Sequence, residues 1–181
     1  MRGAEAILSK TIVIGRPAVV KSRIPKTYRE KKLDEKLRRE RTRSEARLLH
    51  KAKMAGVDCP TVFAVDDFDI TMGFIEGKRP EMTKKQSKEA GVILAKLHEN
   101  DIIHGDYTPA NLIQSDHSLF VIDFGLGFVS KDIEDKATDV FTMLRAIRDK
   151  DDFIKGYRKY EKAESVLGRV KGIEKRVRYA F

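Results

Sequence analysis

The sequence predicts an α+β fold: a small antiparallel sheet with one long helix comes first, and a mostly helical part follows. Short β-rich runs punctuated by Gly15 and Pro17 occupy the start of the chain. Strong helix formers then continue from about residue 27 to residue 54, and Gly56 is placed to stop that helix. Beyond residue 80, apolar residues recur mainly at helical spacing.

The strands of the predicted sheet are short. Residues 5–8, 11–14 and 18–21 are β-rich runs before the long helix, and residues 62–65 and 68–75 are two more after it. Together these runs predict a five-stranded sheet.

The second half begins with a linker at residues 77–80. Thr83 and Gln86 have the spacing of a capping box, which predicts a helix from there to about residue 100. Its apolar stripe consists of Ala90, Ile93, Leu94 and Leu97. Short apolar runs at 102–104 and 119–123 flank a loop at 105–111, and further helices are predicted at 139–147 and through much of 152–178.

The composition of the 181-residue chain is that of one globular domain. No apolar run approaches the length of a membrane span, and the N-terminus lacks the pattern of a signal peptide, so we expect a cytoplasmic location. A single cysteine, Cys59, excludes an internal disulfide and is interpreted as a buried filler. The histidines show no zinc-binding pattern.

The net charge of +9 is distributed unevenly. Residues 21–53 contain 14 lysines and arginines against 5 acidic residues, and residues 168–181 contain 5 against 1. Such basic regions attract polyanions, and RNA is the natural candidate in a cytoplasmic protein. A solvated helix face that needs no partner is the open alternative.

The chemistry is concentrated in residues 104–111 and 121–125. Asp106 and Asn111 are five residues apart on a loop, and Asp123 follows a short apolar run twelve residues further on. One carboxylate of such a set can orient and deprotonate an attacking hydroxyl, while the amide oxygen and the other carboxylate bind Mg²⁺. The alternative is ordinary turn chemistry, in which Asp and Asn are also common.

These two segments resemble the catalytic loop and the magnesium-binding motif of the protein-kinase superfamily. The resemblance implies Mg-ATP as cofactor, Asp106 as the catalytic base, and Asn111 and Asp123 as metal ligands. Most protein kinases have an arginine where this chain has Gly105. Because that arginine reads a phosphorylated activation loop, its absence implies an enzyme that is not switched in this way.

A lysine at the end of an apolar strand can bind ATP phosphates if a carboxylate from a packed helix holds it. Lys21 ends such a run, and Glu45 lies in phase with the apolar stripe of the long helix. We therefore predict a Lys21–Glu45 pair, which matches the strand lysine and helix glutamate of kinases. Pairing of Glu45 with a neighbouring arginine on the helix surface is the alternative, and Glu40 is the next candidate acid.

The predicted nucleotide pocket is less distinctive. The glycine-rich loop of kinases is reduced to Gly3 and Ala4. Four residues are candidates to line the adenine pocket, though each fits ordinary core equally well: Val19, Met72, Phe74 and Ile113. Asp139 resembles the buried aspartate of the kinase helix that binds the catalytic loop, and a helix N-cap is its alternative.

The combination of these motifs with the basic helix at 33–46 and with residues 133–136 resembles the small PRPK-type kinases of the KEOPS complex. That resemblance implies a reduced two-lobed protein-kinase-like fold in one domain, 1–181. Its parts would be an N-lobe (1–76), a hinge (77–80) and a minimal C-lobe with a basic tail (81–181). Gly73 departs from the acidic residue that this family usually has before the hinge.

The resemblance also implies an ATPase and Ser/Thr protein kinase that supports threonylcarbamoylation of tRNA while docked on the threonylcarbamoyl-transferase subunit and the other KEOPS subunits. It directs the basic segment 175–179 toward the partner or toward tRNA, with a solvated chain end as the alternative. Two other classes stay open. One is a small-molecule phosphotransferase or a RIO-like kinase, and the other is a non-catalytic scaffold that binds tRNA or protein.

Overall fold

An antiparallel sheet of four strands, in the order β1-β2-β4-β3, forms the N-terminal part of the computed structural model, which describes residues 6–116 and 118–178. Its strands are β1 (Ala6–Val13), β2 (Arg16–Arg23), β3 (Val62–Val65) and β4 (Asp69–Gly73). The predicted five-stranded sheet is therefore wrong, because residues 6–8 and 11–13 belong to one strand. Pairing with β2 continues through Ser9 and Lys10, and the chain reverses only at Ile14 and Gly15. Both have positive φ, as a tight two-residue hairpin requires.

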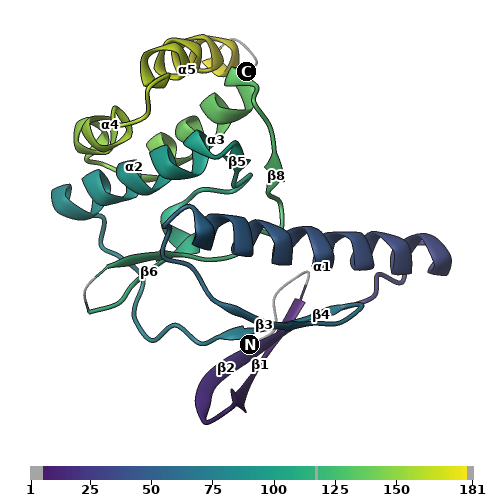
Figure 1. The fold of residues 1–181 in the computed structure, drawn as a ribbon. Helices are drawn as coiled ribbons and strands as arrows, with labels where there is room; N and C mark the ends of the chain where they lie inside the picture. Colours follow the sequence, from purple (N-terminus) through teal and green to yellow (C-terminus); the bar gives the residue numbers. More distant parts are fainter. Residues whose placement is uncertain (1–5, 117, 179–181) are drawn as a thin grey trace.

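Helix α1 (Lys31–Met54) lies between the sheet and the other helices (Figure 1). It begins four residues later than predicted because the Glu30 side chain accepts the N–H groups of Lys32 and Leu33 and so caps the helix there. Gly56, with φ of 72°, follows its C-terminal end, as predicted.

The helical part consists of α2 (Lys84–Glu99), α3 (Ile133–Ala146), α4 (Lys150–Tyr157) and α5 (Ala163–Arg178). The capping box of Thr83 and Gln86 opens α2, as predicted. Helix α3 starts six residues before the predicted position because the Asp132 carboxylate accepts the N–H of Glu134. Asp139 is therefore inside α3, and its interpretation as an N-cap is wrong.

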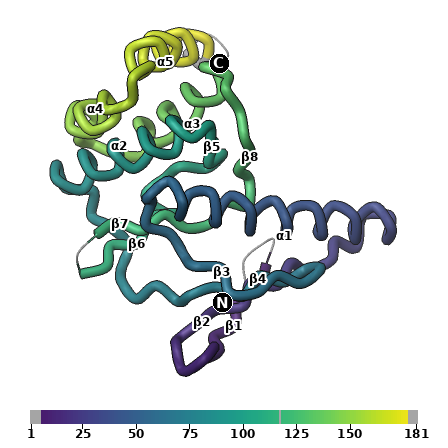
Figure 2. The backbone as a smooth tube through the Cα atoms, in the orientation of Figure 1, coloured from purple at the N-terminus to yellow at the C-terminus, as the bar shows by residue number. Residues whose placement is uncertain are grey.

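Two short strand pairs lie outside the four-stranded sheet. Strand β5 (Ile102–Ile103) pairs with β8 (Phe128–Val129), and β6 (Leu112–Gln114) pairs with β7 (Leu119–Val121). A short 3₁₀ turn, Pro109–Asn111, precedes β6. Figure 2 shows β6 and β7 side by side near the start of α2. These pairs hold in place the loop at 104–111 and the residues that follow β7.

The core depends on a close crossing of α2 and α4. A Cβ atom on Gly91 would lie 2.1 Å from the Phe153 carbonyl oxygen, and one on Gly156 would lie 2.0 Å from that of Lys88. Both glycines are required by this contact between two helix backbones. Cys59 is buried, as predicted, and burial raises the pKa of its thiol to about 11. Within the described residues, no helix combines the length and the apolarity needed to cross a membrane.

Candidate active site

A cavity of about 670 Å³ opens between the four-stranded sheet and the helical part. Its volume lies in the range of small-molecule and cofactor sites. Eight of the residues predicted for the site line it: Val19, Lys21, Glu45, Met72, Phe74, Asp106, Ile113 and Asp123. Asn111 contacts the lining residue Asp106, and Gly3 and Ala4 lie outside the described residues.

One carboxylate joins α1 to the sheet at the inner end of the cavity. Glu45, only 1% exposed, receives the Lys21 ammonium at 2.6 Å on one oxygen. Its other oxygen receives the Arg23 guanidinium at 2.5 Å. A buried carboxylate needs such cationic donors. The predicted Lys21–Glu45 pair is therefore present, and Glu40, the next candidate acid, lies exposed beside Lys36.

Asp123 faces Lys21 from the other side. Its Oδ1 accepts the Lys21 ammonium at 2.8 Å and the backbone N–H of Gly125 at 3.2 Å. Burial raises the pKa of Asp123, but the charge and hydrogen bond of Lys21 outweigh it, and this pKa lies below its usual range. Asp123 therefore stays ionised. Its backbone is left-handed, with φ of 62°, a conformation that non-glycine residues adopt at some cost.

Asp106 and Asn111 are held against each other. The Asn111 amide nitrogen donates to the backbone carbonyl and to Oδ2 of Asp106, both at 2.8 Å. His104 Nε2 lies 3.1 Å from the Ile122 carbonyl, which can only accept, so this nitrogen carries the proton. Its Nδ1 accepts the backbone N–H of Asp106 at 3.3 Å. Burial lowers the pKa of His104, which keeps the ring neutral in this role.

The donor set fits magnesium. Asp123 uses Oδ1 for its contacts and Asn111 uses its amide nitrogen, so among the described residues neither Asp123 Oδ2 nor Asn111 Oδ1 accepts a hydrogen bond. These are hard oxygen ligands of the kind that magnesium prefers. No group of three or more His, Cys, Asp or Glu in the described part of the chain could hold a metal by protein ligands alone. Such a donor pair suits an ion that also binds phosphate oxygens.

Gly105, at the position where most protein kinases have an arginine, has a conformational reason to be glycine. Its φ is 80°, and a Cβ atom there would lie 2.4 Å from the Leu126 carbonyl oxygen. No side chain fits at this close approach without moving the backbone of one of the two segments.

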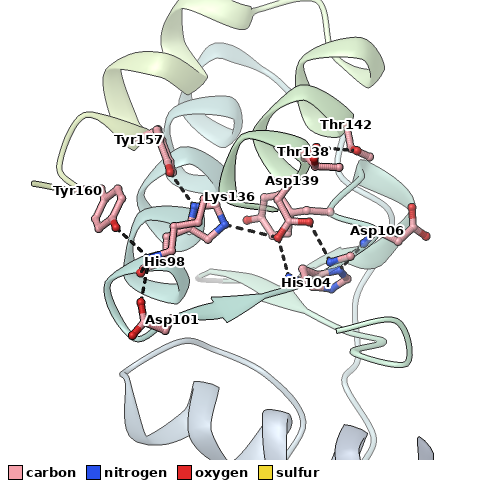
Figure 3. Close-up of polar contacts among 12 residues, drawn as sticks. His98, Asp101, His104, Asp106, Lys136, Thr138, Asp139, Thr142, Tyr157 and Tyr160 are labelled. Atoms are coloured by element: carbon pink, nitrogen blue, oxygen red, sulfur yellow. Dashed lines mark hydrogen bonds and ion pairs between the residues drawn. The ribbon is translucent and has the colours of Figure 1, made fainter. Parts of the chain in front are cut away.

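Asp139 holds the first residues of the loop at 104–111, which is called the catalytic loop below (Figure 3). Its carboxylate accepts the backbone N–H of His104 at 2.6 Å and that of Gly105 at 2.8 Å. His98 Nε2 lies 3.5 Å from the same carboxylate, and the Tyr157 hydroxyl lies 2.6 Å from His98 Nδ1. Because a carboxylate can only accept, Nε2 carries the proton and Tyr157 donates to Nδ1. Burial lowers the pKa of His98.

Val19, Met72 and Ile113 lie on the apolar side of the cavity, where Met72 is buried and the other two are half-buried. Phe74 is 39% exposed at the end of β4, and the Lys10 ammonium lies 4.7 Å from its ring centroid. A flat apolar surface of this kind suits a planar base. A second cavity, about 520 Å³, borders Thr108 and contains none of the predicted catalytic residues.

Sequence reasoning missed three residues in and around this site. Arg23 follows Lys21 by two residues on β2, so strand periodicity would have placed both on one face. Lys136 and His98 are buried on α3 and α2. Helical phase could have found both, because His98 follows Leu94 by four residues and Lys136 precedes Val140 by four.

Comparison with known proteins places this geometry in a family. The RIO domain family matches residues 18–160. The Rio2 kinase from Chaetomium thermophilum, solved as an ADP/Mg²⁺–phosphoaspartate complex, shares the fold with a TM-score of 0.71 at 14% identity, over 93% of this chain and 64% of that one. The chain therefore belongs to the RIO domain family of atypical protein kinases.

Two curated relatives define its place more closely. A probable serine/threonine-protein kinase BUD32 homolog from Archaeoglobus fulgidus is 44% identical over 89% of this chain and 88% of its own length. A probable bifunctional tRNA threonylcarbamoyladenosine biosynthesis protein from Methanosarcina mazei is 40% identical over 92% of this chain. The chain spans about a third of the length of such bifunctional relatives, 32% here. The resemblance to small PRPK-type kinases of the KEOPS complex that was predicted from the sequence is confirmed.

Proposed function

We propose that the chain transfers the terminal phosphoryl group of Mg-ATP, as an ATPase and as a Ser/Thr protein kinase that includes itself among its acceptors. The observation that carries this proposal is the meeting of Lys21, Glu45, Asp106 and Asp123 around one cavity of nucleotide size. Four separate segments of the chain contribute these groups. Neither a surface turn nor an ordinary hydrophobic core requires these charged side chains to lie around one cavity.

Each side chain has a role in this proposal. Asp106 accepts the proton of the attacking hydroxyl or water, and Asn111 fixes its carboxylate through the 2.8 Å hydrogen bond. Asn111 Oδ1 and Asp123 Oδ2 are the oxygens that would hold magnesium. Magnesium bound there would supply neutralisation of the phosphate charge. Lys21, held by Glu45, binds the phosphates in exchange for its contact with Asp123.

The adenine base is assigned to the apolar side of the cavity, and Gly3 with Ala4 to the lid over the phosphates. The lobe boundaries that we propose are 1–76 and 81–181, with the hinge at 77–80. Lys78 supports that assignment, since its backbone N–H and C=O pair with Gln114 and connect the hinge to β6.

The biological role that we propose is support of tRNA threonylcarbamoyladenosine formation in the cytoplasm, the process that the name of the Methanosarcina mazei relative gives for that protein. The partners would be the threonylcarbamoyl-transferase and the other KEOPS subunits. The basic face of α1 and the basic C-terminal tail would contact tRNA. This interaction would weaken steeply as salt concentration rises, and an affinity that salt leaves unchanged would contradict an electrostatic surface.

Reconstitution tests this role. The full chain is combined with the partner subunits, tRNA, ATP and the threonylcarbamoyl precursor, and the modified nucleoside is measured by mass spectrometry. We expect modification to require the chain and to be lost with Asp106→Ala. Equal modification by Asp106→Ala would remove phosphoryl transfer from this role.

A further inference from the structure

Helix α3 holds both ends of the segment that leads into the catalytic loop (Figure 3). The segment, residues 101–105, contains the turn after α2, strand β5 and the first loop residues. Asp139 binds its far end through the N–H groups of His104 and Gly105. One helical turn earlier on α3, the buried Lys136 binds its near end.

All three donors of the Lys136 ammonium are used. It donates to the His98 carbonyl at 2.9 Å, to Asp101 Oδ1 at 2.9 Å and to the Tyr160 hydroxyl at 3.0 Å. Burial lowers the pKa of Lys136, but the hydrogen bonds of Tyr160 and Asp101 outweigh it, so this pKa lies above its usual value. The buried Lys136 side chain is therefore a cation, and it caps the C-terminal end of α2 through the His98 carbonyl.

The residue that Lys136 holds has an unusual backbone. Asp101 is left-handed, with φ of 56°, a conformation that is uncommon outside glycine and that aspartate adopts more readily than most residues. Its N–H donates to the His98 carbonyl at 3.2 Å, and its own carbonyl accepts the N–H of Ser130 at 3.0 Å. This turn sets the direction in which β5 leaves α2, and Asp106 lies five residues further on.

We propose that Lys136 is a positioning residue for the catalytic loop. By fixing the turn at Asp101 while Asp139 fixes Gly105, it sets where the Asp106 carboxylate lies in the cavity. The catalytic loop is thereby held at two points by one helix, α3. Because Lys136 also contacts Tyr160, the position of the loop depends on how the junction of α4 and α5 packs. The kinetic side of this inference rests on the proposed function.

The kinetic experiment uses Lys136→Met, which removes the charge and nearly keeps the size. We expect kcat for ATP hydrolysis to fall about tenfold or more, because the catalytic base, Asp106, would be displaced from its position in the cavity. The KM for ATP should stay within about twofold, since the phosphate- and adenine-binding side chains lie mainly on the sheet. Tyr160→Phe, which removes one of three hydrogen bonds, should lose clearly less.

A rescue experiment separates a positioning role of Lys136 from a general contribution to the stability of the fold. Glycine accepts the left-handed conformation without strain. Lys136→Met combined with Asp101→Gly should therefore recover part of the lost kcat. No recovery, or an unchanged kcat in Lys136→Met alone, would overturn the proposal. If Lys136→Met does not fold, Asp101→Asn takes its place: it keeps a turn-forming residue without the ion pair, and it must lower kcat.

Amide hydrogen exchange gives a readout that needs no activity. In Lys136→Met, exchange at His104 and Gly105 should accelerate about tenfold or more, while exchange at Leu94 and Leu97 in the middle of α2 should not change. Equal acceleration at all four amides would show loss of stability alone and overturn the proposal. A wild-type chain that hydrolyses no ATP would contradict the proposed function, and the exchange data would still decide the role of Lys136.

Discussion

Glu45 on α1 and Lys21 on β2 are joined by a buried contact of 2.6 Å across 24 residues of sequence. Lys21 also contacts Asp123, 102 residues further along the chain. One ammonium thus connects α1, the four-stranded sheet and Asp123, which follows β7. In the function that we propose, the position of that ammonium sets where the ATP phosphates are bound.

Removal of either member of the pair should therefore have the same effect. We expect Lys21→Met and Glu45→Gln each to lower kcat/KM for ATP by about a hundredfold, because the phosphates lose their positioned cation. The double variant should lose no more than the larger single loss, since the two residues act as one unit. Steady-state kinetics at saturating Mg²⁺ measures all three.

Glu40→Gln is the matched control, because Glu40 lies on the same helix but is exposed beside Lys36. Its kinetics should equal those of the wild-type chain. Losses that multiply in the double variant would mean that Lys21 and Glu45 act independently.

Stability should fall as the pH drops below about 6.5. Burial lowers the pKa values of His98 and His104, so in this range the unfolded chain binds protons that the folded chain does not. The free energy of unfolding then decreases with falling pH, by at most about 1.4 kcal/mol per pH unit for each histidine, until the lowered pKa values are reached.

Urea denaturation at pH 7.5 and at pH 5.5 checks this expectation. His98→Asn should reduce the pH dependence by about half, if the two buried histidines contribute alike. The exposed His50, changed to Gln, should leave it as it is in the wild-type chain. A wild-type chain equally stable at both pH values would contradict neutral, buried histidines.

The crossing of α2 and α4 makes a third prediction. Gly91→Ala should destabilise the fold by about 2 kcal/mol or more, because its methyl group would collide with the backbone of Phe153. Gly168→Ala on α5 meets open space and should stabilise by about 0.5 to 1 kcal/mol, since alanine favours the helix. Thermal unfolding compares the two, and a tolerated Gly91→Ala would mean that the helices are further apart.

Much of this arrangement could be predicted from local signals. The capping box of Thr83, the helix stop at Gly56 and the phase of Glu45 on α1 are short-range patterns, and the predicted contact of Glu45 with Lys21 is present. The spacing of Asp106, Asn111 and Asp123 likewise pointed to one site.

What could not be predicted depends on packing between distant segments. The partners of Lys136 and His98 could not be predicted, because Tyr160 and Tyr157 meet them only when α2, α3 and the α4–α5 junction are brought together. Arg23 was missed because Lys21 alone satisfied the expected pair. The single strand β1 was divided in two because polar Ser9 and Lys10 interrupted its apolar pattern, although an exposed strand in a hairpin tolerates them.

Mg²⁺-dependent ATP turnover by the purified chain and by Asp106→Ala, followed through phosphate release and autophosphorylation, tests the central claim most directly. Asp106 is half-buried at the cavity, so this variant should keep the wild-type thermal stability to within about 1 kcal/mol. The account predicts turnover by the wild-type chain that chelation of Mg²⁺ abolishes, and a loss of at least about a hundredfold in the variant. Equal turnover by a folded Asp106→Ala would contradict it.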